Sequence, residues 1–160
     1  MDQVGTMPPP AGFIRLPMAG LADFTARNLP LHIRTEDGHL VGGFRVAPEH
    51  CNPAGTCHGG MIATFCDILL AFAGLFEGRL ETMILPTISL SIDYLAPARP
   101  GAWMEARADI IKTTRTMLFA QALIHTDGAP SARVNGVFKV PTPDPSGIDT
   151  GAWLRGLLGV

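Results

Sequence analysis

The longest hydrophobic run of the chain lies near its middle. Residues 61–76 are apolar on every side of a helical projection and contain one charged residue, Asp67. A surface helix has one apolar stripe and one polar face, whereas a helix that is apolar all round is buried. Sixteen residues of helix extend about 24 Å, which is too short and too interrupted for a good membrane span. The run therefore predicts the central helix of a soluble domain, wrapped by other elements.

Hydrophobic positions that alternate with a period of two predict strands on both sides of this helix. Before it, residues 31–34 and 40–46 are strand candidates, and an Asp-Gly pair at 37–38 predicts a hairpin between them. After it, four strands are predicted around residues 87–94, 104–110, 118–124 and 132–140. Short turns between consecutive strands favour an antiparallel sheet. Such a sheet twists and can curl around the one long helix, so the expected fold class is α+β.

The two ends of the chain lack this alternation. Residues 1–29 are expected to form an N-terminal arm with a short helix near 20–28, and residues 30–141 form the predicted domain. Residues 142–160 combine a Pro-rich linker with a short final helix, which Asp149 or Thr150 would cap. The chain therefore reads as one domain with an extension at each end.

Composition narrows the class of protein. The chain has 160 residues, of which 47% are hydrophobic and 16% charged, and this suits a single globular domain. Its net charge is −2 and it has no block of Lys and Arg, so neither nucleic acid nor a membrane is an expected partner. Three cysteines cannot all pair, which makes free thiols in a reducing cytoplasm the simplest expectation. The N-terminal segment does not read as a signal peptide.

The central helix and the loop before it carry the candidate chemistry. Asp67 would be costly to ionise on a buried helix unless it has partners or its pKa rises, which makes it the first candidate. Residues 52–60 read Asn-Pro-Ala-Gly-Thr-Cys-His-Gly-Gly, and Asp67 follows His58 by nine residues. Residues 93–97, at the end of a predicted strand, read Asp-Tyr-Leu-Ala-Pro.

These motifs resemble those of the hotdog-fold acyl-CoA thioesterases. The closest resemblance is to the PaaI-like branch, typified by the phenylacetyl-CoA and 4-hydroxyphenylacetyl-CoA thioesterases, and it covers roughly residues 30–140. It implies a hotdog fold, in which a curved antiparallel sheet wraps around one long central helix. It also implies hydrolysis of an aryl- or medium-chain acyl-CoA to a free acid and CoA, with no cofactor.

The resemblance further implies roles for particular residues. Asp67 would activate water or attack the carbonyl carbon as a nucleophile. The N–H of Gly59, at the positive end of the helix, would hold the developing oxyanion. Asn52 would position the water or the thioester, and Thr87, a second positioning residue, would assist the Asp67 carboxylate and the water. His58 belongs to the same site, and we rank an orienting role above proton transfer for it.

Substrate binding has weaker candidates. Gly60, like any glycine, lets a ligand approach the backbone closely. Three basic residues next to the predicted sheet, Arg99, Lys112 and Arg115, are expected at turns. They are either solvated charges or contacts for the phosphates of CoA. The spacing of the Cys and His residues before the helix is not that of a paired zinc knuckle, so no metal is expected.

The spacing of two candidates has a consequence for assembly. Gly59 and Asp67 are eight residues apart, so on one helix they are separated by about 12 Å. They cannot both contact one carbonyl group. If both act on the same thioester, they come from two copies whose helices run antiparallel across a two-fold axis. The expected assembly is a homodimer with two composite sites, or a dimer of such dimers.

Other interpretations of these residues stay open. Asp67 could be a structural carboxylate, Asn52 could only fix the turn before Pro53, and His58 could only cap the helix. The rival functions are a non-hydrolytic module that binds acyl-CoA or acyl carrier protein, and a hotdog-fold hydratase or dehydratase.

Overall fold

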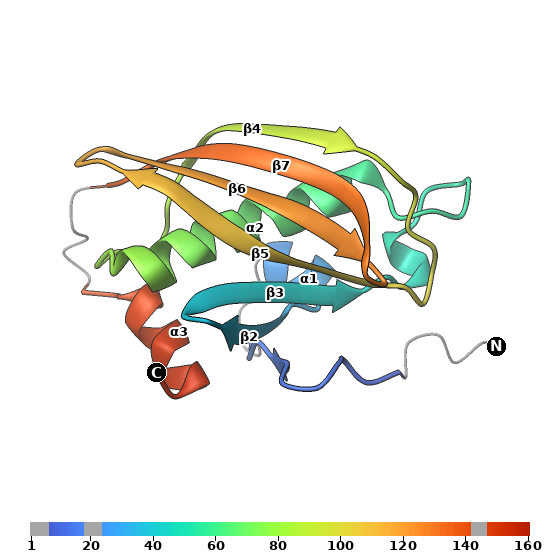
Figure 1. The fold of residues 1–160 in the computed structure, drawn as a ribbon, viewed down its shortest axis with the longest axis horizontal. Helices are drawn as coiled ribbons and strands as arrows, with labels where there is room; N and C mark the ends of the chain where they lie inside the picture. Colours follow the sequence, from blue (N-terminus) through green and yellow to red (C-terminus); the bar gives the residue numbers. More distant parts are fainter. Residues whose placement is uncertain (1–6, 18–23, 142–146) are drawn as a thin grey trace.

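The computed structural model describes residues 7–17, 24–141 and 147–160, and one long helix crosses the inner face of a curved antiparallel sheet (Figure 1). In chain order the elements are β1 (Ile14–Arg15), α1 (Phe24–Asn28), β2 (His32–Glu36), β3 (His39–Arg45), a 3₁₀ helix (Pro48–His50), α2 (Gly59–Gly78), β4 (Thr87–Tyr94), β5 (Trp103–Thr113), β6 (Met117–Thr126), β7 (Ala129–Lys139) and α3 (Thr150–Leu158). The expected α+β class and the hotdog arrangement are confirmed.

The seven strands of the described residues lie in the order β1-β2-β3-β5-β6-β7-β4, and each pairs antiparallel with its neighbours. The predicted hairpin joins β2 and β3. Its turn residues Asp37 and Gly38 have φ values of 50° and 82°, the left-handed conformation that an Asp-Gly turn requires. Asp127 and Gly128, between β6 and β7, repeat this conformation with φ values of 48° and 85°.

One part of the expected topology is wrong. The expectation of consecutive strands joined by tight turns holds for β5, β6 and β7. It fails for β4, which pairs with β7 at the edge of the sheet and not with β5. Residues 95–102 carry the chain from β4 across the end of the sheet to β5. The two strands are three spacings apart, about 14 Å, and a loop of this length spans that distance easily. Alternation predicts a strand but does not say which strand lies beside it.

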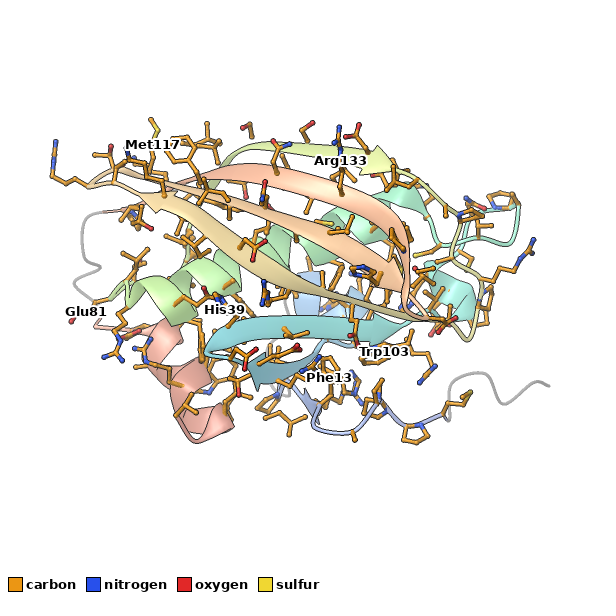
Figure 2. The ribbon with its side chains drawn as sticks, in the orientation of Figure 1. Phe13, His39, Glu81, Trp103, Met117 and Arg133 are labelled. Atoms are coloured by element: carbon orange, nitrogen blue, oxygen red, sulfur yellow. The ribbon has the colours of Figure 1, made fainter. Side chains whose placement is uncertain are left out.

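The N-terminal arm also differs from expectation. It contributes a two-residue strand, β1, which is too short to show a period and was not predicted. Phe13 packs edge-on against Trp103 with 5.1 Å between ring centroids, and Figure 2 shows the two side chains together below β3. Of the helix expected near 20–28, the structure describes Phe24–Asn28 as α1, and residues 20–23 lie outside the described part.

The core lies between α2 and the inner face of the sheet. The rings of Phe44 on β3 and Phe65 on α2 are 5.1 Å apart and fully buried, and Phe138 on β7 is equally buried. By length and composition alone α2, with 20 residues and a mean hydropathy of 1.8, could cross a membrane, but half of that window is buried inside the molecule. The core helices of soluble proteins have the same character.

The sheet covers only one side of α2. On the other side the helix presents an outer stripe of small or polar residues, which are partly or fully exposed: Gly60, Ala63, Thr64, Asp67 and Ala71. The helix was expected to be wrapped on all sides, but within one chain the sheet covers only one face of it. Within one chain, Asp67 lies on the uncovered face.

The final helix α3 packs against the C-terminal half of α2. Asp149 caps it as predicted, because its side chain accepts a hydrogen bond of 2.8 Å from the N–H of Ala152. The Arg155 guanidinium donates a 2.9 Å hydrogen bond to the carbonyl of Phe76, in the last turn of α2. This arrangement places a cation at the negative end of the helix dipole.

Gly151 tests how closely the two helices pack. A Cβ at this position would lie 2.3 Å from the carbonyl oxygen of Leu75, so Gly151→Ala is expected to lower the free energy of unfolding by about 1–3 kcal/mol. Gly156→Ala on the same helix meets nothing within 4 Å and should raise it by up to about 1 kcal/mol. Urea unfolding measures both, and equal effects would contradict the close packing.

Candidate active site

The loop before α2 is held by the side chain of Asn52. Its Oδ1 accepts hydrogen bonds from the backbone N–H groups of Ala54 at 2.9 Å and Thr56 at 3.3 Å, and its Nδ2 donates to the Thr56 hydroxyl at 3.1 Å. Cys51 and Cys57 face each other across the narrow base of this loop. Asn52 therefore fixes the turn, which is the structural role left open by the sequence.

The loop is anchored to the connection between β4 and β5. The Cys57 N–H donates to the carbonyl of Ala98 at 2.8 Å, and the His58 N–H donates to the carbonyl of His50 at 2.8 Å. These two bonds fix the direction in which the chain enters α2. The first turn of the helix is thus held in place by the loop between β4 and β5 and by the 3₁₀ helix.

His58 is the N-cap of α2. Its Nδ1 accepts a 2.8 Å hydrogen bond from the N–H of Gly60, which accords with the orienting role ranked first for it. No acceptor in the described part of the chain takes a hydrogen bond from the neighbouring Gly59 N–H. That N–H remains available to a ligand at the positive end of the helix.

Tyr94, the only tyrosine of the chain, is the neighbour of Gly59 that the sequence analysis missed. Its hydroxyl donates a 2.9 Å hydrogen bond to the Gly59 carbonyl. A Cβ at position 59 would lie 3.3 Å from the Tyr94 ring, so any other residue there would press against this ring. Tyr94 belongs to the motif at residues 93–97, at the end of a predicted strand, and neither the motif nor the strand pattern indicates this contact. Burial raises the pKa of Tyr94, so its hydroxyl stays protonated and can donate.

Asp67 and Thr87 are in contact. The Thr87 hydroxyl donates a hydrogen bond of 2.6 Å to Asp67 Oδ1. Thr87 is the first residue of β4, beside an irregularity in the pairing with β7, and α2 carries Asp67 past this strand end. A short hydrogen bond to an ionised carboxylate is one of the stronger kinds. The structure thus brings together the two residues that the sequence analysis linked, while their catalytic roles stay predictions.

The structure does not bring Gly59 next to Asp67. Both residues lie on α2, eight residues apart, which is about 12 Å along the helix. The two proposed halves of the site are therefore separate within one chain, as the spacing predicts.

The cysteines near the site are neutral. Burial raises the pKa of Cys57 to about 12, and the nearby Cys51 thiol adds to the effect. Burial, and then the Asp67 carboxylate, raise the pKa of Cys66 to about 12. The thiolate is the nucleophilic form of cysteine. At neutral pH neither residue supplies it, although Cys57 precedes a histidine.

The predicted CoA contacts are not gathered in one chain. Arg99 lies in the loop before β5, and Arg115 lies in the turn after it. β5 has 11 residues, so it separates them by roughly 35 Å. Figure 2 shows Trp103, at the start of β5, and Met117, just beyond the turn, at opposite ends of the sheet. Lys112 belongs to β5 and not to a turn, which corrects the expectation.

Two pockets flank the first turn of α2. The Gly59 pocket, about 300 Å³, lies between that turn and the end of β4, with Gly59, Ile62, Tyr94 and Ala98 among its lining residues. The α1 pocket, about 750 Å³, lies on the other side, between the turn and α1. Arg15 and Arg27 line it, and neither was a candidate from the sequence, because only the fold brings them together.

Comparison with known proteins places this geometry in a family. Residues 54–131 match the model of the thioesterase superfamily. A protein of Pseudomonas aeruginosa named "putative esterase" is 35% identical over 64% of this chain and 75% of its own length. Human acyl-coenzyme A thioesterase 13 is 30% identical over 51% of this chain and 57% of its own length.

Solved structures agree on the fold. Zebra fish thioesterase superfamily member 2 superposes with a TM-score of 0.69 at 26% identity, covering 78% of this chain and 91% of that chain. The PaaI protein of E. coli gives 0.66 at 20% identity, with 76% and 87% covered. A hypothetical thioesterase of Streptococcus pneumoniae, solved with coenzyme A, gives 0.63 at 22% identity, with 71% and 90% covered.

The chain belongs to the thioesterase superfamily, with the hotdog fold. The resemblance to the PaaI-like branch is confirmed at the level of the fold, since PaaI is among the structural neighbours. Within that superfamily the protein is a thioester hydrolase.

The turn role of Asn52 gives a prediction about stability. Asn52→Ala removes the acceptor for two backbone N–H groups and is expected to lower the free energy of unfolding by about 1–3 kcal/mol. Asn52→Asp keeps that acceptor and should stay within about 1 kcal/mol of the wild type. Urea unfolding of both variants checks this, and an equal loss in the two would show that the turn bonds do not matter.

Proposed function

We propose that the protein hydrolyses an acyl-CoA thioester to a free acid and CoA. Membership of the thioesterase superfamily supports this reaction. The relative named acyl-coenzyme A thioesterase 13 and the streptococcal neighbour solved with coenzyme A support CoA as the carrier. The observation that carries the proposal is the Asp67–Thr87 pair on the outer stripe of α2, where a ligand or a second chain can reach it.

Asp67 is the group that starts the reaction. In one route it takes a proton from water as the water oxygen bonds to the carbonyl carbon, and in the other it attacks that carbon itself and water hydrolyses the resulting anhydride. In both routes the carbonyl electrons move to oxygen and return to carbon as the C–S bond breaks. In the first route the proton that Asp67 took from water passes to the leaving sulfur, and in the second CoA leaves as the thiolate and takes a proton from water. The Thr87 hydroxyl holds the carboxylate in place for either step.

The Gly59 N–H stabilises the oxyanion. It has no acceptor in the described part of the chain, it lies at the positive end of α2, and the Gly59 pocket opens beside it. Donors placed in advance at the site of developing charge supply a large part of catalysis in acyl transfer. The Tyr94 hydroxyl, through its bond to the Gly59 carbonyl, fixes the orientation of this turn.

The complete site requires a second copy of the chain. Gly59 and Asp67 of one α2 are about 12 Å apart, so the two must come from helices that run antiparallel. The outer stripe of α2 consists of small residues that allow close approach. β4 has a free edge, with Ile88 exposed near its start and Ile84 exposed in the segment before it. We propose a homodimer with two composite sites, in which these surfaces meet.

Substitutions of Asp67 and Thr87 test the carboxylate. Asp67→Asn is expected to reduce thiol release from an acyl-CoA panel by roughly 100- to 10,000-fold, because the amide neither accepts a proton nor attacks. Thr87→Val should cost about 10- to 100-fold through the lost hydrogen bond, and Thr87→Ser should restore most of the rate. Full activity of Asp67→Asn would contradict the assignment of Asp67 as base or nucleophile. Conversion of an enoyl-CoA without thiol release would indicate a hydratase or dehydratase instead.

A matched pair at position 59 tests the oxyanion donor. Gly59→Pro removes the N–H, and proline suits the first position of a helix after His58, whose φ and ψ are −63° and 135°. It should lower kcat by about 100- to 1,000-fold. Gly59→Ala places the same Cβ against Tyr94 but keeps the N–H, so its loss should be within about tenfold. Similar losses in the two variants would point to crowding and against the donor.

A further inference from the structure

The α1 pocket has the dimensions of a ligand site. Its volume of about 750 Å³ falls within the range of pockets that bind small molecules. Phe24 and Met61 contribute apolar surface, and Thr64 and His58 contribute polar groups. Of the lining residues that the structure describes, three carry a formal charge at neutral pH: Arg15, Arg27 and Glu49.

The two arginines of this pocket are unpaired. Neither guanidinium forms an ion pair or a hydrogen bond with any residue in the described part of the chain. The other arginines on structured elements behave differently. Arg45 donates hydrogen bonds to three backbone carbonyls, and the rest each lie within 4 Å of a carboxylate: Arg34, Arg107, Arg133 and Arg155. The described lining thus holds two guanidinium groups and one carboxylate, that of Glu49, which gives it an excess positive charge. Burial lowers the pKa of His50, a buried residue of the wall, so it stays neutral and adds no charge.

The pocket adjoins the proposed reaction centre. Gly60 and Thr64 line it, and they are one helical turn apart on the outer stripe that also carries Asp67. Gly60 immediately follows the residue whose N–H is the proposed oxyanion donor. A thioester held at that N–H therefore has one of its two ends within reach of the α1 pocket.

We propose that the α1 pocket binds an anionic group of the thioester substrate, held by Arg15 and Arg27. This inference rests on the proposed function and adds a specificity site to it. A guanidinium matches the geometry of a carboxylate or a phosphate with two parallel hydrogen bonds. Two sources supply such a group: the phosphates of CoA, or a carboxylate at the far end of the acyl chain. Phe24 and Met61 then pack against the methylene groups between the anion and the thioester.

Kinetics of the double variant Arg15→Gln/Arg27→Gln test this directly. Four substrates separate the sources: a neutral acyl group and an ω-carboxyacyl group, each carried on CoA and on pantetheine, which has no phosphate. The control is Arg107→Gln, which removes a cation from the outer face of the sheet, where Arg107 pairs with Asp109 at 3.3 Å. Circular dichroism and urea unfolding confirm that each variant folds.

The double variant is expected to raise KM by about tenfold or more with little change in kcat, and only for substrates that carry the recognised anion. If CoA supplies it, both CoA esters are affected and both pantetheine esters are not. If the acyl chain supplies it, both ω-carboxyacyl esters are affected and both neutral esters are not. An equal change for the neutral pantetheine ester, or no change for any substrate, would overturn the proposal.

A binding measurement separates failure of this proposal from failure of the proposed function. If the wild-type protein releases no thiol from any substrate, the function fails while the pocket can still be tested. Calorimetric titration of free CoA and of an ω-carboxyacyl-CoA into the wild type and the double variant then gives the answer. Binding in the variant should be about tenfold weaker for both ligands if CoA supplies the anion, and for the ω-carboxyacyl-CoA alone if the acyl chain supplies it. Equal affinities of the two proteins for both ligands, or no heat of binding in either protein, would refute the anion site.

Discussion

The position of one carboxylate on one buried helix constrains everything else in this protein. α2 is apolar enough to form the core, and the sheet covers only one side of it. Asp67 lies on the uncovered side, where the Thr87 hydroxyl holds it at 2.6 Å. A carboxylate on the opposite face of the helix would be enclosed by the core, whereas this one lies where a ligand can reach it. The same helix presents the free Gly59 N–H about 12 Å away, which is too far for one chain to use both on one carbonyl.

The strands and loops around α2 position its first turn. Ala98, in the loop that crosses the end of the sheet, accepts the N–H of Cys57, and Tyr94 at the end of β4 bonds to the Gly59 carbonyl. β4 also supplies Thr87 from its other end. The edge strand β4 therefore contacts both halves of the proposed site. Its pairing with β7 in the sheet matters more to function than its order along the chain. A change in β4 should affect the oxyanion donor and the carboxylate together.

The sequence predicted what depends on local pattern. The long helix, the hairpin at Asp37 and Gly38, the capped final helix and the link between Asp67 and Thr87 follow from periodicity, turn chemistry and a family motif. The place of β4 beside β7 could not be predicted, because alternation does not encode which strands are neighbours. The contact of Tyr94 with Gly59 depends on the tertiary arrangement, and so does the presence of Arg15 and Arg27 in one pocket. The motif indicated Asn52 as a candidate, but only coordinates show its side chain closing the turn before α2.

Complementation between two inactive variants tests the central claim most directly. Gly59→Pro and Asp67→Asn chains are co-expressed with different tags, and the mixed dimer is isolated by both tags in turn. If each site takes its N–H from one copy and its carboxylate from the other, one site of the mixed dimer carries both defects and the other carries none. The account predicts about half of the wild-type turnover per dimer, far above either parent. A mixed dimer as inactive as its parents would show that each site is built within a single chain, and would contradict the account.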